Sequence, residues 1–127
     1  MAQQWLKGST NAPLVYRDTA VTNTAAAVTN RETELMGWNI INPNSTDVYV
    51  KFVDASSGTI TVGTTAVVRT LLVPANTTIY QNSVTGSPQL YFTTGMSVYA
   101  VTALADSNTT APSTAVHLCI MYKTGQP

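Results

Sequence analysis

The sequence predicts an all-β protein, a β-sandwich of the jelly-roll or Ig-like kind with about eight antiparallel strands. Threonine is the commonest residue and valine is abundant, and both β-branched side chains favour extended backbone over helix. The apolar stretches are short and separated by turn residues, as in all-β chains. No stretch spaces its apolar residues at helical intervals over three turns.

The first strand candidates lie in the N-terminal third of the chain. Residues 13–22 (PLVYRDTAVT) and 25–29 (AAAVT) are modest candidates that Asn23 separates. Residues 34–42 (ELMGWNIIN) form a stronger one, which ends where Pro43 removes a ladder donor between two turn-favouring asparagines.

The next candidate, residues 46–55 (TDVYVKFVDA), alternates clearly. Its period of two predicts one face with Val48, Val50 and Phe52, and an opposite face with Tyr49, Lys51 and Val53. The turn residues that follow, up to Gly58, predict a hairpin-like connection to a further strand at residues 59–62 (TITV).

The second half of the chain continues the pattern. Residues 66–74 (AVVRTLLVP) carry apolar side chains on both faces, as expected of a strand inside a sandwich or one buried by a second subunit. Residues 76–81 (NTTIYQ) are short and predict an edge strand. The remaining candidates are residues 88–92 (PQLYF), 96–105 (MSVYAVTALA) and 114–123 (TAVHLCIMYK).

The chain reads as an extended N-terminal arm, residues 1–12, followed by a single β-sandwich domain, residues 13–127. The arm is polar apart from Trp5 and Leu6. A tryptophan on an arm can anchor in a neighbour's pocket, since this residue is frequent among interface hot spots. A tryptophan packed onto its own domain fits the sequence as well.

The composition is that of a protein that works by contact. Charged residues make up 9% of the 127 residues, against a typical value of about 25%, and the formal net charge is zero. The six Lys and Arg residues are scattered singly, which argues against nucleic-acid binding through phosphates. No apolar run approaches the ~20 residues of a membrane span, so we expect no membrane partner.

Residues 116–123 hold the only histidine, His117, and the only cysteine, Cys119. Alternation puts both on one strand face, about 7 Å apart, whereas a nucleophile and its base need roughly 3 Å. Two side chains are also too few for a zinc site. We therefore expect that the face with Cys119 and Met121 packs beneath another layer, and that the protein is no enzyme and needs no cofactor or metal.

Three stretches resemble small structural proteins of tailed-phage virions. They are residues 38–58 (WNIINPNSTDVYVKFVDASSG), 71–81 (LLVPANTTIYQ) and 90–123 (LYFTTGMSVYAVTALADSNTTAPSTAVHLCIMYK), where a glycine-initiated strand leads through a Thr/Ala/Pro-rich loop into the last strand. Proteins of this kind are capsid decoration (cement) proteins, head-fibre bases or tail accessory modules, usually oligomeric β-sandwiches. The arm lies outside the resemblance, and no catalytic residues accompany it.

The resemblance implies a virion structural protein, foremost a decoration protein that stabilises the head through oligomeric contacts. Its partners would be the major capsid protein and copies of itself, as a homotrimer that covers edge strands. It would lie on the capsid surface, and in the host cytoplasm during assembly. The interface residues that we expect, on the arm and on the loops 42–47 and 106–114, are Trp5, Leu6, Asn44, Asp106, Asn108 and Pro112.

Two other functions stay open. A tail or fibre accessory module would bind a host receptor or a glycan, for which the six tyrosines could supply stacking rings, although tyrosine is also a favoured strand residue. A small β-sandwich enzyme is the third reading. The loop 106–114 suits conformational fitting at a tip, but an idle solvated loop fits it equally.

Overall fold

The computed structural model describes residues 13–56, 58–81 and 88–124, so the predicted arm with Trp5 and Leu6 lies outside the described residues. The described residues form strands and turns without a helix, which confirms the all-β prediction. The strands are β1 (Leu14–Val21), β2 (Ala26–Ala27), β3 (Thr33–Asn42), β4 (Val48–Asp54), β5 (Arg69–Val73), β6 (Thr77–Gln81), β7 (Leu90–Phe92), β8 (Met96–Val101) and β9 (Val116–Thr124).

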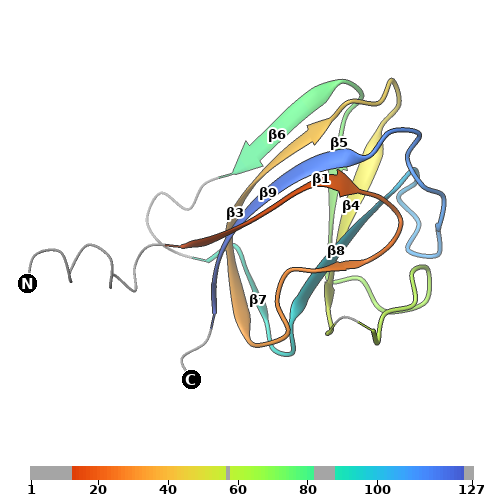
Figure 1. The fold of residues 1–127 in the computed structure, drawn as a ribbon. Helices are drawn as coiled ribbons and strands as arrows, with labels where there is room; N and C mark the ends of the chain where they lie inside the picture. The colour runs from red at the N-terminus through yellow and green to blue at the C-terminus, as the bar shows by residue number, and fades with distance from the viewer. Residues whose placement is uncertain (1–12, 57, 82–87, 125–127) are drawn as a thin grey trace, which may run out of the picture.

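Two antiparallel sheets pack against each other, as the sandwich prediction requires (Figure 1). The five-stranded sheet has the order β1-β9-β3-β6, with β7 also paired to β3, and the four-stranded sheet has the order β2-β8-β4-β5. β6 lies at an edge, which confirms the prediction for residues 76–81. β1, at the other edge, and β9 are far apart in sequence.

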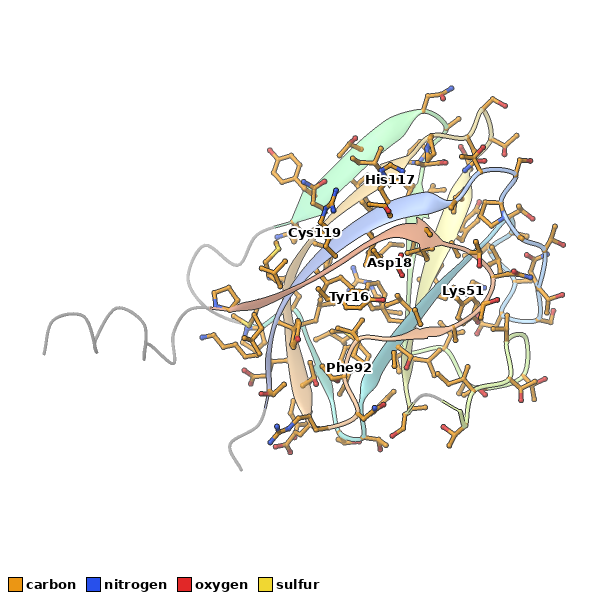
Figure 2. All side chains as sticks on the ribbon, in the orientation of Figure 1. Tyr16, Asp18, Lys51, Phe92, His117 and Cys119 are labelled. Atoms are coloured by element: carbon orange, nitrogen blue, oxygen red, sulfur yellow. The ribbon has the colours of Figure 1, made fainter. Side chains whose placement is uncertain are left out.

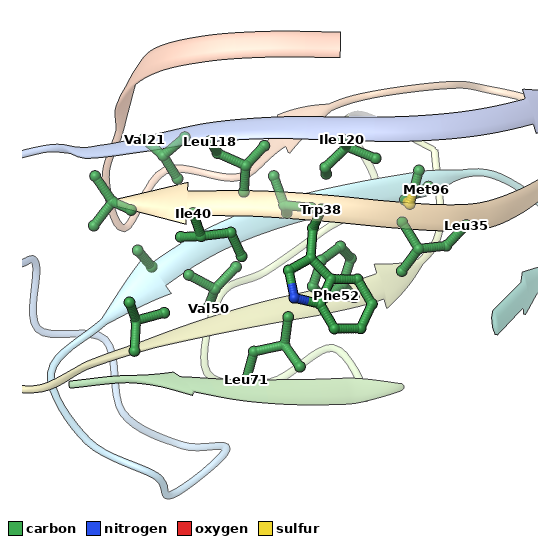
Figure 3. Packing of buried hydrophobic residues seen from close by; sticks show 14 of the residues in the cluster. Val21, Leu35, Trp38, Ile40, Val50, Phe52, Leu71, Met96, Leu118 and Ile120 are labelled. Carbon is green, nitrogen blue, oxygen red and sulfur yellow. The ribbon is translucent and has the colours of Figure 1, made fainter. Parts of the chain in front are cut away.

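The main core lies between the two sheets (Figure 3). The ring centroid of Phe52 on β4 lies 6.5 Å from that of Trp38 on β3 and 6.4 Å from that of Phe92 on β7. β9 turns Leu118 and Ile120 into this core, as its alternation predicts. Each such side chain stabilises the fold by roughly 1.5–3 kcal/mol when fully buried.

β4 is buried on both faces. Val50 and Phe52 enter the main core, as predicted, while Lys51 and Val53 on the opposite face are 0% and 1% exposed. Val53 belongs to a second, smaller cluster with Tyr99 and Val101 of β8. The four-stranded sheet is therefore covered on its outer face too.

The cover explains one wrong prediction, the strand at residues 59–62. These residues form bends and turns, and β4 pairs instead with β5 and β8. Ile60 and Val62 pack against the second cluster, so an alternating apolar pattern here belongs to a loop lying on a sheet. We call residues 58–65 and 102–110 the covering loops; the second begins where the predicted strand 96–105 ends early, at Val101.

The apolar residues on both faces of residues 66–74 also have a structural reason. β5 is an edge strand that directs Leu71 and Val73 into the core. Leu72, on its other face, is 48% exposed, and the preceding Val68 is 43% exposed. One of the two predicted faces is therefore open to solvent among the described residues.

Candidate functional site

The outer faces of the two sheets differ. The covering loops close the outer face of the four-stranded sheet around Lys51, whose ammonium donates to the carbonyl oxygens of Leu104 (2.8 Å) and Ala105 (2.7 Å). It also lies 3.4 Å from the Asp106 carboxylate. Asp106 itself is exposed, as its predicted interface role needs. Its ion pair with Lys51 also gives it a structural role in the covering loop.

No described segment covers the outer face of the five-stranded sheet over β1, β9, β3 and β6. Its ladders bring four side chains into one row, because Arg17 lies opposite Cys119, Cys119 opposite Asn39, and Asn39 opposite Tyr80. Figure 2 shows His117 and Cys119 on the side of β9 that points away from Lys51 and Phe92.

A second row runs beside the first. Ile41 lies opposite His117 on β9 and opposite Thr78 on β6, and Thr19 of β1 lies next to His117. Six outward side chains of these two rows form a surface that we call the docking face. They are Arg17, Thr19, Asn39, Ile41, Tyr80 and His117.

A hollow of about 270 Å³ lies in the docking face. The β1 ladder is irregular beside it, because two residues, Thr19 and Ala20, lie between Asp18 and Val21 where β9 has only His117. The lining residues are Arg17, Thr19, Asn39, Ile41, His117, Leu118 and Cys119.

Asp18 holds this bulge in place. Its carboxylate accepts hydrogen bonds from the Ala20 amide (2.8 Å) and from the Tyr16 hydroxyl (3.1 Å). Burial and then this hydrogen bond raise the pKa of Tyr16 to about 12. Strand alternation places Asp18 on the opposite face of β1 from Arg17, its neighbour in sequence.

His117 and Cys119 both line the hollow, and no hydrogen bond joins them. The prediction that Cys119 and Met121 pack beneath another layer is wrong for the described residues, since both are half-buried on an open face. Cys119 is a free thiol. Within the described ranges, no group of three His, Cys, Asp or Glu side chains lies close enough to hold a metal ion.

The polar side chains of the hollow have no partners in the described part of the chain. The guanidinium of Arg17, the amide of Asn39 and the ring of His117 make no hydrogen bond or ion pair there. Exposed donors beside exposed apolar side chains, 42% for Ile41 and 71% for Tyr80, are the chemistry of a binding surface.

The two loops predicted as contact sites meet at one end of the sandwich. The Asn44 amide donates to the Asn42 carboxamide oxygen (2.9 Å) and to the Thr114 carbonyl (2.9 Å), and its oxygen accepts from the Thr114 amide (2.7 Å). Asn44 is 5% exposed and Pro112 is buried, whereas Asn108 is half-exposed. Their interface role stays a prediction; Asn44 already has a structural one.

A second hollow, of about 300 Å³, opens beside this junction. Its lining consists of hydroxyl and amide side chains with one proline and carries no charge. The lining residues are Pro43, Asn44, Ser45, Thr46, Asn76, Ser113 and Thr114.

Comparisons with known proteins give no family assignment. No protein-family model matches the sequence, and no curated protein matches it significantly. No helix in residues 13–56, 58–81 and 88–124 is long and apolar enough to cross a membrane.

Sequence reasoning missed Arg17, Thr19, Asn39 and Ile41. Alternation in β9 pointed to His117 and Cys119 as a shared face, which is correct. The other four join them only through long-range pairing of β1 and β3 with β9, for which a single sequence gives no signal.

Proposed function

We propose that the protein is a structural component of a tailed-phage virion, a capsid decoration protein that stabilises the head through contacts with the major capsid protein and with its own copies. The observation that carries this proposal is the docking face, an open sheet surface with unpaired donors and exposed apolar side chains over four strands. The resemblance of residues 38–123 supplies the virion context.

The charge balance supports a role in assembly. A chain with 9% charged residues and no net charge meets little long-range repulsion when many copies crowd onto one particle. Edge strands β1, β5 and β6 offer backbone groups that neighbouring copies would cover, which favours a closed oligomer such as a trimer.

The test is binding of the full chain to purified phage heads that lack it. We expect saturable binding and a higher temperature of head disruption, with the chain detected by mass spectrometry in particles that carry it. A chain that stays free in solution with heads present at micromolar concentration would refute the proposal.

A second function, a tail or fibre module that binds a glycan, is favoured by the uncharged hollow between residues 43–46 and 113–114. Hydroxyl and amide groups suit a neutral sugar. A glycan array distinguishes the two: glycan binding that Asn76→Ala weakens, without binding to heads, supports the module and refutes decoration.

A further inference from the structure

The docking face presents a positive charge that has no counter-charge. Arg17 is exposed on β1, and none of the lining residues of the hollow is acidic. The nearest acid in sequence, Asp18, faces the other side of the sheet, where it holds Tyr16 and Ala20. An open guanidinium without an acid favours an anionic ligand.

The groups around Arg17 fit a carboxylate. The guanidinium can donate two parallel hydrogen bonds to its two oxygens. Asn39, on the same ladder row, offers amide donors, and Thr19 and His117 offer further donors at the rim.

The docking face also has exposed apolar side chains that an apolar group of a ligand would cover. Ile41 lies two strands and one row from Arg17, about 12 Å away, and Tyr80 lies three strands away in the same row, about 14 Å. An extended peptide rises about 3.3 Å per residue and alternates its side chains, so an acidic and an apolar side chain four residues apart share a face and span about 13 Å. A small free anion would leave Ile41 and Tyr80 exposed, and a nucleic acid would meet too few cations.

We infer that the docking face binds an acidic segment of a partner protein, with an Asp or Glu on Arg17 and an apolar side chain on Ile41 and Tyr80. This inference rests on the proposed function, in which that segment belongs to the major capsid protein. The predicted arm of a sister chain is the poorer occupant, because residues 1–12 contain no acid.

A peptide titration tests the recognition chemistry. The probe is the capped peptide acetyl-AEGGGLA-amide, with its Glu-to-Gln analogue as control, titrated into the isotope-labelled full chain and followed by NMR. We expect the Glu peptide to shift resonances of Arg17, Asn39 and Ile41, with affinity about five- to tenfold weaker for the Gln analogue. Equal affinity of the two peptides, or shifts confined to other surfaces, would overturn the inference.

Matched variants complete the test. Arg17→Glu should weaken Glu-peptide binding at least as much as the Gln analogue does, whereas Arg31→Glu, which reverses the same charge at an exposed site outside the hollow, should not. Preserved dispersion of the NMR spectrum shows that each variant folds, and Arg17→Gln repeats the test with a milder change. Equal loss in the Arg17 and Arg31 variants would overturn the inference.

Binding to phage heads separates the inference from the proposed function. If wild type and Arg17→Glu bind heads equally, the inference fails and decoration stands. If no version binds heads but the Glu peptide still requires Arg17, acid recognition stands and decoration fails.

Discussion

The ammonium of Lys51 lies 2.8 Å from the carbonyl oxygen of Leu104, so a lysine in the middle of a strand holds a loop that begins more than fifty residues later. Its side chain is fully buried. A buried charge is tolerated only where hydrogen bonds replace its hydration, and two carbonyl oxygens and the edge of a carboxylate do this here.

Replacing Lys51 should loosen the cover of the four-stranded sheet. Lys51→Met keeps the apolar stem but removes the ammonium that donates to both carbonyl oxygens. We expect a loss of about 2–3 kcal/mol in the free energy of unfolding. Asp106→Ala should cost below about 1 kcal/mol, because that carboxylate is largely exposed. Urea denaturation measures both, with Lys123→Met as control; a loss from Lys51→Met no larger than the control's would contradict this role.

Asn44 should matter far more than Asn108. Asn44→Ala leaves the Thr114 amide and carbonyl without their partner, and we expect a cost of about 2–3 kcal/mol. Asn108→Ala removes one 3.3 Å hydrogen bond, which the Asn108 side-chain oxygen accepts from the Thr110 amide. It should lower the free energy of unfolding by about 0.5 kcal/mol. Hydrogen exchange should show faster exchange at Thr114 in the first variant alone; unchanged protection there would refute the link between the two loops.

Gly63 and Gly58 form a matched pair. Both have positive φ, +88° and +90°, so alanine is strained at either position. A Cβ at Gly63 would also lie 2.6 Å from the Thr109 methyl and 3.1 Å from the Ser107 carbonyl, whereas one at Gly58 meets nothing within 4 Å. We expect Gly58→Ala to cost about 1 kcal/mol and Gly63→Ala about 1–3 kcal/mol more. Equal thermal unfolding temperatures would show that the covering loops do not pack closely.

Asp54 should make the fold sensitive to acid. Burial opposes its ionisation, but hydrogen bonds from the Thr93 and Thr94 amides (2.9 and 2.8 Å), the Gly95 amide and the Thr93 hydroxyl outweigh it and lower its pKa. A lowered folded-state pKa adds stability that is fully present above the unfolded-state pKa of about 4. This stability is lost as the pH falls from there through the folded-state pKa.

Asp54→Asn should therefore reduce stability at pH 7 and flatten the decline of stability below about pH 4. Thr93→Val, which removes only the hydroxyl donor, should show the same change to a smaller extent. Urea midpoints measured from pH 7 to pH 2 check both. A decline in Asp54→Asn as steep as in wild type would contradict this role of the carboxylate.

The sequence predicted the sandwich because most strands bury one face. In β9 the alternation correctly separates Leu118 and Ile120 from His117 and Cys119. It failed at residues 59–62, because Ile60 and Val62 cover a sheet from a loop, and apolar side chains two residues apart look alike in both settings. The covering loops lie on a face that carries both apolar Val53 and the polar side chain of Lys51, and the bonds from Lys51 to residues 104 and 105 join residues far apart in the sequence.

The candidate site was less predictable than the fold. Arg17 and Asn39 are twenty-two residues apart, and both meet Cys119 from opposite sides because β9, the last strand, inserts between β1 and β3. Pairing over such sequence distances depends on the whole core. Local patterns therefore identified the face of β9 but not the neighbours on it.

The two outer faces of the sandwich differ, because loops cover the four-stranded sheet whereas the docking face on the five-stranded sheet is open. A copy that binds through its docking face turns the covering loops outward. These loops present exposed threonines such as Thr59, Thr61, Thr64 and Thr110. A coat of such copies would meet the surrounding medium mainly with hydroxyl groups, interrupted by the exposed Leu104 side chain and the Asp106 carboxylate.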